Sequence, residues 1–217
     1  MTISNTKHHD INPPAPKHEL PVWRADGRQL QVVEIFWSIE GEGLRAGQPT
    51  LFIRLSKCNL KCHFCDTKFD HVNEMSVEDL VQKVKRYNVE WVCVTGGEPL
   101  GQNILPLCQA LHHQGYRIHI ETNGTIDPDP DLYHFIEHWT VSPKARTIAH
   151  GLTQITELKY VVGKAFREEH VDEDRASQIY LQAESSEPEF VQKTCEILQR
   201  HPHWRMSPRL HVHFNLR

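Results

Sequence analysis

Three cysteines stand close together in CNLKCHFCDTKF, residues 58–69, as Cys58, Cys62 and Cys65. A structural zinc site normally takes four ligands, and His63, between two of the cysteines, is poorly placed to be the fourth. A redox pair needs only two thiols. A four-iron cluster usually takes four thiolates, so three would leave one iron without a protein ligand. An open metal position of this kind is how catalytic metal sites admit a reactant.

The other cysteines are isolated. Cys93, Cys108 and Cys195 each lie alone in an apolar or helical context. A lone cysteine in such a context behaves as a small hydrophobic side chain. We therefore expect no part in chemistry for these three.

The composition indicates a globular protein. The chain has 217 residues, 39% hydrophobic and 24% charged, with a net charge of −4. This length suits one domain, and the scattered charge favours neither a nucleic-acid partner nor a membrane surface. No apolar run is long enough for a membrane span, and the start lacks a secretory signal. We expect a cytoplasmic protein, in which closely spaced cysteines point to metal binding rather than disulfides.

Residues 1–28 contain many Pro, Asn and His residues, which predicts a poorly ordered N-terminal extension. Residues 29–217 then form one domain without an internal repeat or linker. The chain has sixteen histidines, and we interpret most of them as solvated surface residues.

Strands and helices alternate along this domain. β-Branched and aromatic residues predict strands at 30–37, 50–56, 89–95, 117–122, 138–144, 157–162 and 179–182. Helices are expected from Ser76, with Asp79 as capping partner, at 102–114 before Gly115, and at 187–200. The alternation predicts an α/β fold with a mainly parallel sheet.

Sites of such sheets gather at the carboxyl ends of the strands. The cysteine segment, TGGEP, ETNG and SPK all follow predicted strands. We therefore expect these four segments to meet in one site.

The motif C-x3-C-x2-C, with TGGEPL downstream, resembles the signature of the radical S-adenosylmethionine (SAM) superfamily. More narrowly, SIEGEG, FIRLSKCNLKCHFCDTKF, TGGEPL, IETNGT, VSPKA and ELKYVV occur in the order seen in the 7-carboxy-7-deazaguanine synthase family. The resemblance covers roughly residues 30–217 and implies a partial, incomplete β/α barrel of the radical SAM type. It implies a carbon–nitrogen lyase that acts in the pathway to queuosine and other deazapurines.

The resemblance also implies the cofactors. Cys58, Cys62 and Cys65 would hold a [4Fe–4S] cluster whose fourth iron takes the amino and carboxylate groups of SAM. Reductive cleavage of SAM would give a 5′-deoxyadenosyl radical, and the protein would supply positioning and electronics. The SAM-binding residues implied are Phe64, Gly97, Glu98, Ser142, Pro143 and Lys144.

The implied substrate is 6-carboxy-5,6,7,8-tetrahydropterin, converted to 7-carboxy-7-deazaguanine with loss of ammonia. Arg54 would meet the substrate carboxylate through its planar guanidinium, and Thr67 would place a hydroxyl on Mg²⁺. A homodimer and an external electron donor are also implied. The substrate-binding residues implied are Ile39, Glu40, Gly41, Arg54, Thr95 and Arg217.

The chain departs from this family at several positions. Glu40 stands where the family usually has Gln, and Ala183 where a Pro is common. The C-terminal Gln-Thr-His-Lys of many members keeps only its histidine, as His211. His211 and His213 share one face of a strand by their spacing, which hints at metal but is better read as two solvated or core histidines.

Two alternatives remain at this stage. One is a different radical SAM enzyme, such as a glycyl-radical activase, which acts on a protein. The other is a non-enzymatic iron–sulfur or zinc-binding module. Retention of Arg54 and Thr67 favours the pterin enzyme over the first, and the ordered GGEP and SPK segments favour it over the second.

Overall fold

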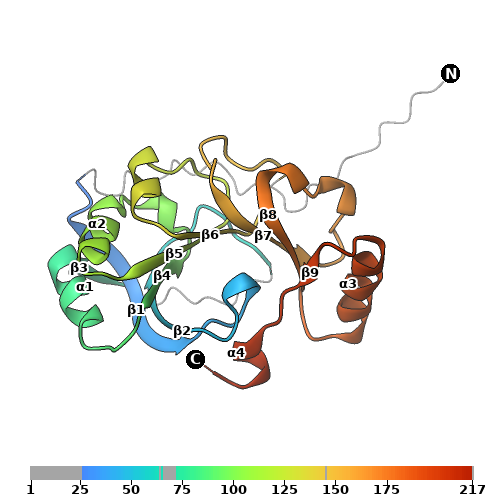
Figure 1. Ribbon diagram of the computed structural model, residues 1–217, viewed down its shortest axis with the longest axis horizontal. Helices are drawn as coiled ribbons and strands as arrows, with labels where there is room; N and C mark the ends of the chain where they lie inside the picture. Colours follow the sequence, from blue (N-terminus) through green and yellow to red (C-terminus); the bar gives the residue numbers. More distant parts are fainter. Residues whose placement is uncertain (1–25, 64, 66–71, 145, 217) are drawn as a thin grey trace.

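The protein is built on one curved sheet of nine strands in the order β3-β1-β2-β4-β5-β6-β7-β8-β9 (Figure 1). The structure, a computed structural model, describes residues 26–63, 65, 72–144 and 146–216. The strands are β1 Gln29–Ile39, β2 Pro49–Leu55, β3 Asn73–Ser76, β4 Trp91–Gly96, β5 Arg117–Thr122, β6 His138–Val141, β7 Ile155–Val162, β8 Ala176–Ala183 and β9 Arg205–Met206.

The sheet is parallel except where β1 pairs with its two neighbours. Every neighbouring pair from β2 to β9 is parallel, whereas β1 pairs antiparallel with both β2 and β3. Among the described strands, β3 and β9 stand at opposite ends, so the sheet is an open, incomplete barrel. The predicted α/β class with a mainly parallel sheet is confirmed.

The α-helices are α1 Val77–Val84, α2 Leu105–His113, α3 Pro188–Arg200 and α4 Leu210–His213. Ser76 caps α1 as predicted, because its hydroxyl accepts a hydrogen bond from the Asp79 backbone N–H at 3.0 Å. The helix α2 ends before Gly115, whose φ of +84° suits glycine. Helices α1 and α2 pack together at one end of the sheet, and α3 packs on β7, β8 and β9 at the other (Figure 1).

Short 3₁₀-helices stand in several connections, and between β5 and β6 and between β7 and β8 they are present in place of an α-helix. The 3₁₀-helices are η1 Gly43–Arg45, η2 Pro99–Gly101, η3 Pro130–His134, η4 Glu168–His170 and η5 Glu173–Arg175. No helix in the described part of the chain is long and apolar enough to cross a membrane.

The two faces of the sheet differ in character. Ile53, Val92, Ile118 and Leu158, all fully buried, belong to the apolar core shared with α1 and α2. The intervening positions carry many polar groups. Register aligns Arg54 with Thr95, and a row of Cys93, His119 and His138 crosses β4, β5 and β6. Because side chains alternate along a strand, these polar residues share the other face.

Predicted element bounds are mostly close to the observed ones. The predicted strand at 117–122 matches β5, and the helix predicted at 187–200 is α3 from Pro188. The helix predicted at 102–114 begins only at Leu105, after η2, and β6 ends at Val141 rather than residue 144. β3 and β9, which the sequence did not predict, are short edge strands with little apolar pattern.

The prediction that His211 and His213 share a strand face is wrong. Both lie in α4, where residues two positions apart point in different directions. His211 lines the cavity described below, whereas His213 is exposed. The predicted boundary between residues 28 and 29 stays a prediction, because residues 1–25 lie outside the described part.

Candidate active site

A cavity of about 840 Å³ opens where the parallel strands reach their carboxyl ends. It is lined by residues of β1, β2, β4, β5, β6, β7 and β8, and also of α4. The predicted cysteine segment, the GGEP turn, ETN and SPK all contribute lining residues, so their expected convergence is seen. The predicted residues in the lining are Ile39, Glu40, Gly41, Arg54, Cys58, Cys62, Cys65, Thr95, Gly97, Ser142 and Lys144.

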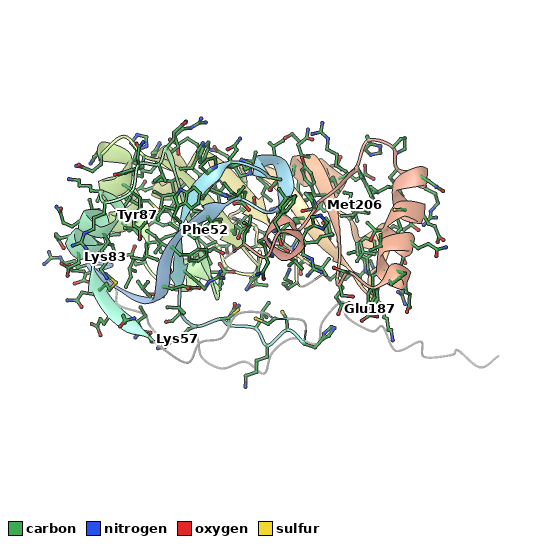
Figure 2. All side chains as sticks on the ribbon, turned by 90° about the horizontal axis from the view of Figure 1, so that it is seen from below. Phe52, Lys57, Lys83, Tyr87, Glu187 and Met206 are labelled. Atoms are coloured by element: carbon green, nitrogen blue, oxygen red, sulfur yellow. The ribbon has the colours of Figure 1, made fainter. Side chains whose placement is uncertain are left out.

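The cysteine segment follows β2 through a sharp backbone turn. Lys57, directly before Cys58, has φ of +65°, a left-handed value that is uncommon outside glycine. Lys57 is labelled in Figure 2, where the described residues that follow it run along one edge of the molecule. The Leu60 N–H donates to the Cys58 sulfur at 3.4 Å. Three cysteine sulfurs on one cavity wall, with an N–H directed at one of them, fit the ligand set of an iron–sulfur cluster.

The GGEP turn lies directly against the cysteine segment. The Gly97 N–H donates to the Leu55 carbonyl at 3.1 Å and the Glu98 N–H to the Lys57 carbonyl at 2.9 Å. A Cβ on Gly97 would overlap the Lys57 carbonyl oxygen. Only glycine therefore allows the two loops to come this close.

Glu98 is almost fully buried, and its carboxylate accepts hydrogen bonds from other groups of the protein. Its carboxylate accepts hydrogen bonds from the Leu100 N–H at 3.0 Å, the Thr122 hydroxyl at 2.7 Å and the Asn123 N–H at 2.7 Å. Burial raises the pKa of Glu98 to about 7 in spite of these donors. Glu98 thus joins the GGEP turn to the end of β5, and a direct bond from it to SAM stays a prediction.

Lys159 forms a charged triad with Glu42 and Glu121 inside the cavity. Its ammonium donates to the Glu42 carboxylate and lies 3.3 Å from a Glu121 oxygen. Although burial disfavours the Lys159 ammonium, the Glu121 and Glu42 carboxylates raise its pKa well above the usual value. Burial also opposes the Glu121 carboxylate, but Lys159 lowers the pKa of Glu121 to about 2. Lys159 and Glu121 are therefore both charged at neutral pH.

A second layer of polar side chains, which we call the floor, consists of Glu40, Arg45, His119, Thr140 and Glu157. The Arg45 guanidinium donates to His119 Nδ1 at 2.9 Å, which fixes that nitrogen as an acceptor. His119 Nε2–H therefore donates to Thr140 at 2.8 Å, and the Thr140 hydroxyl donates to Glu157 at 2.6 Å. Burial lowers the pKa of His119 well below its usual value, in keeping with a neutral imidazole.

Glu40 belongs to this floor and is buried. Its Oε2 is buried 3.4 Å from His119 Nδ1, and Oε1 accepts from the Glu42 N–H at 3.3 Å. Burial, and then the Glu121 carboxylate, raises the pKa of Glu40 to about 8. A neutral carboxyl here does not repel an anion in the cavity.

The group formed by Glu40, Cys93 and His119 is a poor cation site although its residues are of metal-ligand types. Glu40, Cys93 and His119 place one ligand atom each within 4.8 Å of one another. The Arg45 guanidinium, however, lies at the same His119 nitrogen. A second cation at that nitrogen would be repelled and would have to displace the arginine.

Aromatic rings and an arginine form the part of the cavity beside β1 and β2. The rings of Phe36 and Phe52 are stacked, with centroids 5.1 Å apart. The Arg54 guanidinium lies 5.4 Å from the Phe36 ring centroid and donates to Glu34 at 3.0 Å. This surface suits a planar ring that carries a negative group.

Several residues predicted for the site do not line the cavity or lie outside the described residues. Pro143 is buried and is not among the lining residues, and Glu98 lies behind the turn. Phe64, Thr67 and Arg217 lie outside the described residues, so their predicted roles remain predictions.

Sequence reasoning missed several polar lining residues: Glu42, Glu121, Asn123, Lys159, Gln182, Arg209 and His211. Lys159 offered a signal, because it is the one cation inside the apolar strand segment ELKYVV. Glu121 and Asn123 stood in the quoted motif IETNGT, but the motif alone did not show which side chains face the cavity.

Known proteins are similar to this chain in sequence and in fold. Residues 52–195 match the family model described as the radical SAM superfamily. The 7-carboxy-7-deazaguanine synthase of Aquifex aeolicus is 34% identical over 205 residues, which is 85% of this chain and 93% of that protein. The protein of the same name from Bacteroides thetaiotaomicron is 35% identical over 187 residues, 86% of this chain and 98% of that protein.

A solved structure agrees with these relatives. The crystal structure of QueE from Escherichia coli superposes with a TM-score of 0.69 at 27% identity, covering 82% of this chain and 93% of that chain. The open parallel sheet and the cavity with three cysteines thus define a radical SAM protein. Within that superfamily, the chain belongs to the 7-carboxy-7-deazaguanine synthase family.

Proposed function

We propose that the protein is a lyase that converts 6-carboxy-5,6,7,8-tetrahydropterin to 7-carboxy-7-deazaguanine with release of ammonia. Family membership supports this activity. The observation that carries it is one cavity that joins the three cysteines to an arginine, a buried lysine and stacked aromatic rings. A bicyclic, anionic substrate requires both the rings and the cations.

Cys58, Cys62 and Cys65 would hold a [4Fe–4S] cluster, with SAM beside it at Gly97, Ser142 and Lys144. When bound, cluster and SAM together supply a carbon radical that removes a hydrogen atom from the substrate. Burial lowers the pKa of Lys144 to about 8, and this residue also donates to the Ser142 hydroxyl. We assign Phe64 and Pro143 to the same SAM-binding region.

The protein's own residues would orient the pterin. The Phe36 and Phe52 rings offer a flat apolar surface, and the Arg54 guanidinium a fork for the carboxylate. The Lys159 ammonium remains charged between two carboxylates, so it provides a fixed donor in the lining of the cavity. Backbone groups of Ile39 to Gly41, with Thr95 and Arg217, complete the proposed set.

We assign a Mg²⁺ ion to the substrate carboxylate, with the Thr67 hydroxyl as the protein ligand. A hard divalent ion prefers oxygen ligands and would bridge protein and carboxylate. Mg²⁺ should then raise product formation severalfold and lower the apparent KM, with little effect on iron content.

Thr67→Ala should lose most of that response. A misplaced substrate costs on the order of a hundredfold in rate, so the change is easy to measure. Initial rates at several Mg²⁺ concentrations, for both proteins at equal iron content, test this. A Thr67→Ala protein with the wild-type response would remove the metal role.

Partners follow from the same proposal. Reductive chemistry needs an external electron donor, and a reducing cytoplasm would keep the three thiols available as ligands. We also propose a homodimer, which sedimentation of the iron-loaded protein would test against a monomer.

Anaerobic reconstitution with iron, sulfide, SAM, a reductant and the carboxypterin tests the activity directly. The expected result is 7-carboxy-7-deazaguanine with no net consumption of SAM. Stoichiometric 5′-deoxyadenosine and methionine without a deazapurine would instead favour another radical SAM reaction.

A further inference from the structure

A ring of hydrogen bonds ties the end of β5 to the cysteine segment. The Asn123 side-chain amide donates to Asn59 Oδ1 at 2.9 Å, and Asn59 Nδ2 donates to the Thr125 hydroxyl at 2.8 Å. Thr125 closes the ring, because its hydroxyl donates to Asn123 Oδ1 at 2.6 Å. Asn59 comes directly after Cys58, so the ring holds the first predicted cluster ligand in place.

The same ring fixes which end of the Asn123 amide faces the cysteine. Asn123 Oδ1 also accepts from the Thr125 backbone N–H at 3.0 Å, and a backbone N–H can only donate. The oxygen of Asn123 therefore points to Thr125 and its NH₂ group to the cysteine segment. That NH₂ group lies 3.8 Å from the Cys58 sulfur, within reach of an N–H···S hydrogen bond.

Asn123 has little freedom to move away. Its side chain and backbone are buried, with an exposed fraction of 8%. Its backbone N–H donates to the Glu98 carboxylate at 2.7 Å, and the Glu98 backbone N–H donates to Lys57 at the base of the cysteine segment. Asn123 is thus held from the side of β5 and from the side of the GGEP turn.

We propose that Asn123 is a positioning residue for the cluster, whose side-chain N–H donates to the Cys58 thiolate and raises the reduction potential of the bound cluster. Hydrogen bonds to ligating sulfurs stabilise the added negative charge of the reduced cluster. With the Leu60 N–H, Cys58 receives two such donors. The inference rests on Cys58 as a cluster ligand but not on the identity of the pterin substrate.

The test compares Asn123→Asp with Asn59→Asp. Both variants add one carboxylate beside Cys58, but only the first removes the N–H directed at the sulfur. Asn123→Asp keeps an oxygen that can accept from Thr125, and Asn59→Asp keeps one that can accept from Asn123. Their difference therefore measures the N–H···S bond apart from the added charge.

The readout is the midpoint potential of the reconstituted cluster without SAM or pterin, followed by electron paramagnetic resonance, with iron content alongside. Asn123→Asp should shift the one-electron reduction equilibrium about tenfold further toward the oxidised cluster than Asn59→Asp does, which corresponds to ~59 mV. Equal potentials in the two variants would overturn the proposal.

If Asn123→Asp does not retain iron, Thr125→Val replaces it. This change frees the Asn123 amide from its clamp without altering Asn123 or adding charge. A lowered potential supports the proposal, and an unchanged one overturns it. A protein that binds the cluster but does not convert the carboxypterin would contradict the proposed function and leave these potentials as a separate result.

Discussion

The part of the cavity lined by the three cysteines, which we call the mouth, and the floor satisfy their polar groups differently. At the mouth, Cys58, Cys62 and Cys65 present sulfurs to the cavity from a segment held by neighbouring loops. On the floor, the Arg45 guanidinium, the His119 ring and the Glu157 carboxylate are joined into one buried chain through Thr140. The mouth is therefore arranged to bind groups that come from outside, and the floor to support the barrel. Lys159 shares features of both regions, because it lines the cavity and is also paired with the Glu42 and Glu121 carboxylates.

The largest expected effect lies at the mouth. Replacement of any one of Cys58, Cys62 or Cys65 by Ala should remove most bound iron and abolish SAM cleavage, because each would supply a thiolate to the cluster. Iron and sulfide analysis after anaerobic reconstitution measures this. Cys195→Ala, an exposed cysteine on α3, is the matched control and should keep its iron. Full cluster content in Cys62→Ala would refute the ligand assignment.

Lys159→Met tests whether Lys159 stabilises the fold, as the floor residues do, or serves only the bound ligand. The change leaves the Glu42 and Glu121 carboxylates inside the cavity without their cation. Loss of one partner from a buried ion pair is strongly destabilising, and with these carboxylates partly exposed we expect ~2–3 kcal/mol. Urea unfolding at pH 7 measures it.

Lys83→Met on the exposed side of α1 should change the free energy of unfolding by less than ~0.5 kcal/mol. The double variant Lys159→Met/Glu121→Gln should recover part of the loss. An effect of Lys159→Met no larger than that of Lys83→Met would show that Lys159 serves the ligand alone.

The effect expected on the floor depends on pH and is smaller, for each pH unit, than the effect of Lys159→Met. Burial, with nearby Glu121 and Glu42, raises the pKa of Glu40 from 4.5 to about 8, against the opposing cations Lys159 and Arg45. Neutral His119 and Cys93 complete its surroundings. The folded protein thus binds more protons than the unfolded chain between these values, and its free energy of unfolding falls as the pH rises.

Glu40→Gln removes this titration. Relative to the variant, the wild type should lose at most ~1.4 kcal/mol for each pH unit between about 4.5 and 8. Unfolding free energies at pH 5, 6.5 and 8 measure the difference. Parallel pH profiles for the two proteins would show that Glu40 is ionised in the folded state.

The residues at the mouth of the cavity could be predicted from the sequence better than those of the floor. The Cys58–Cys65 spacing and the GGEP turn are local patterns, so their place could be predicted before any fold was known. The floor depends on which side of each strand faces inward and on the register across strands. Arg45, for example, meets His119 across 74 positions of sequence, and no local pattern in the chain predicts that pair.

The misread C-terminal segment has a similar cause. Alternation of His211 and His213 suggested a strand, but four residues are too few to separate a strand from a helical turn. What decides the conformation is docking: the Leu210 N–H donates to the Gly41 carbonyl at 3.0 Å, and His211 lies where a Cβ on Gly41 would stand. This contact joins the loop after β1 to α4 and was not visible in either segment alone.

That contact sets an order for the growing polypeptide during translation. Most of the described groups that hold the cysteine segment come from residues 55–144, and Glu184, which lies 2.7 Å from His63, also precedes Arg209 and His211, which the cavity wall at Gly41 needs. Since domains emerge from the ribosome with the N-terminal part first, the region that would receive iron and SAM is synthesised while the pterin side still lacks one wall. The wall at Gly41 is therefore completed only after His211 has left the ribosome.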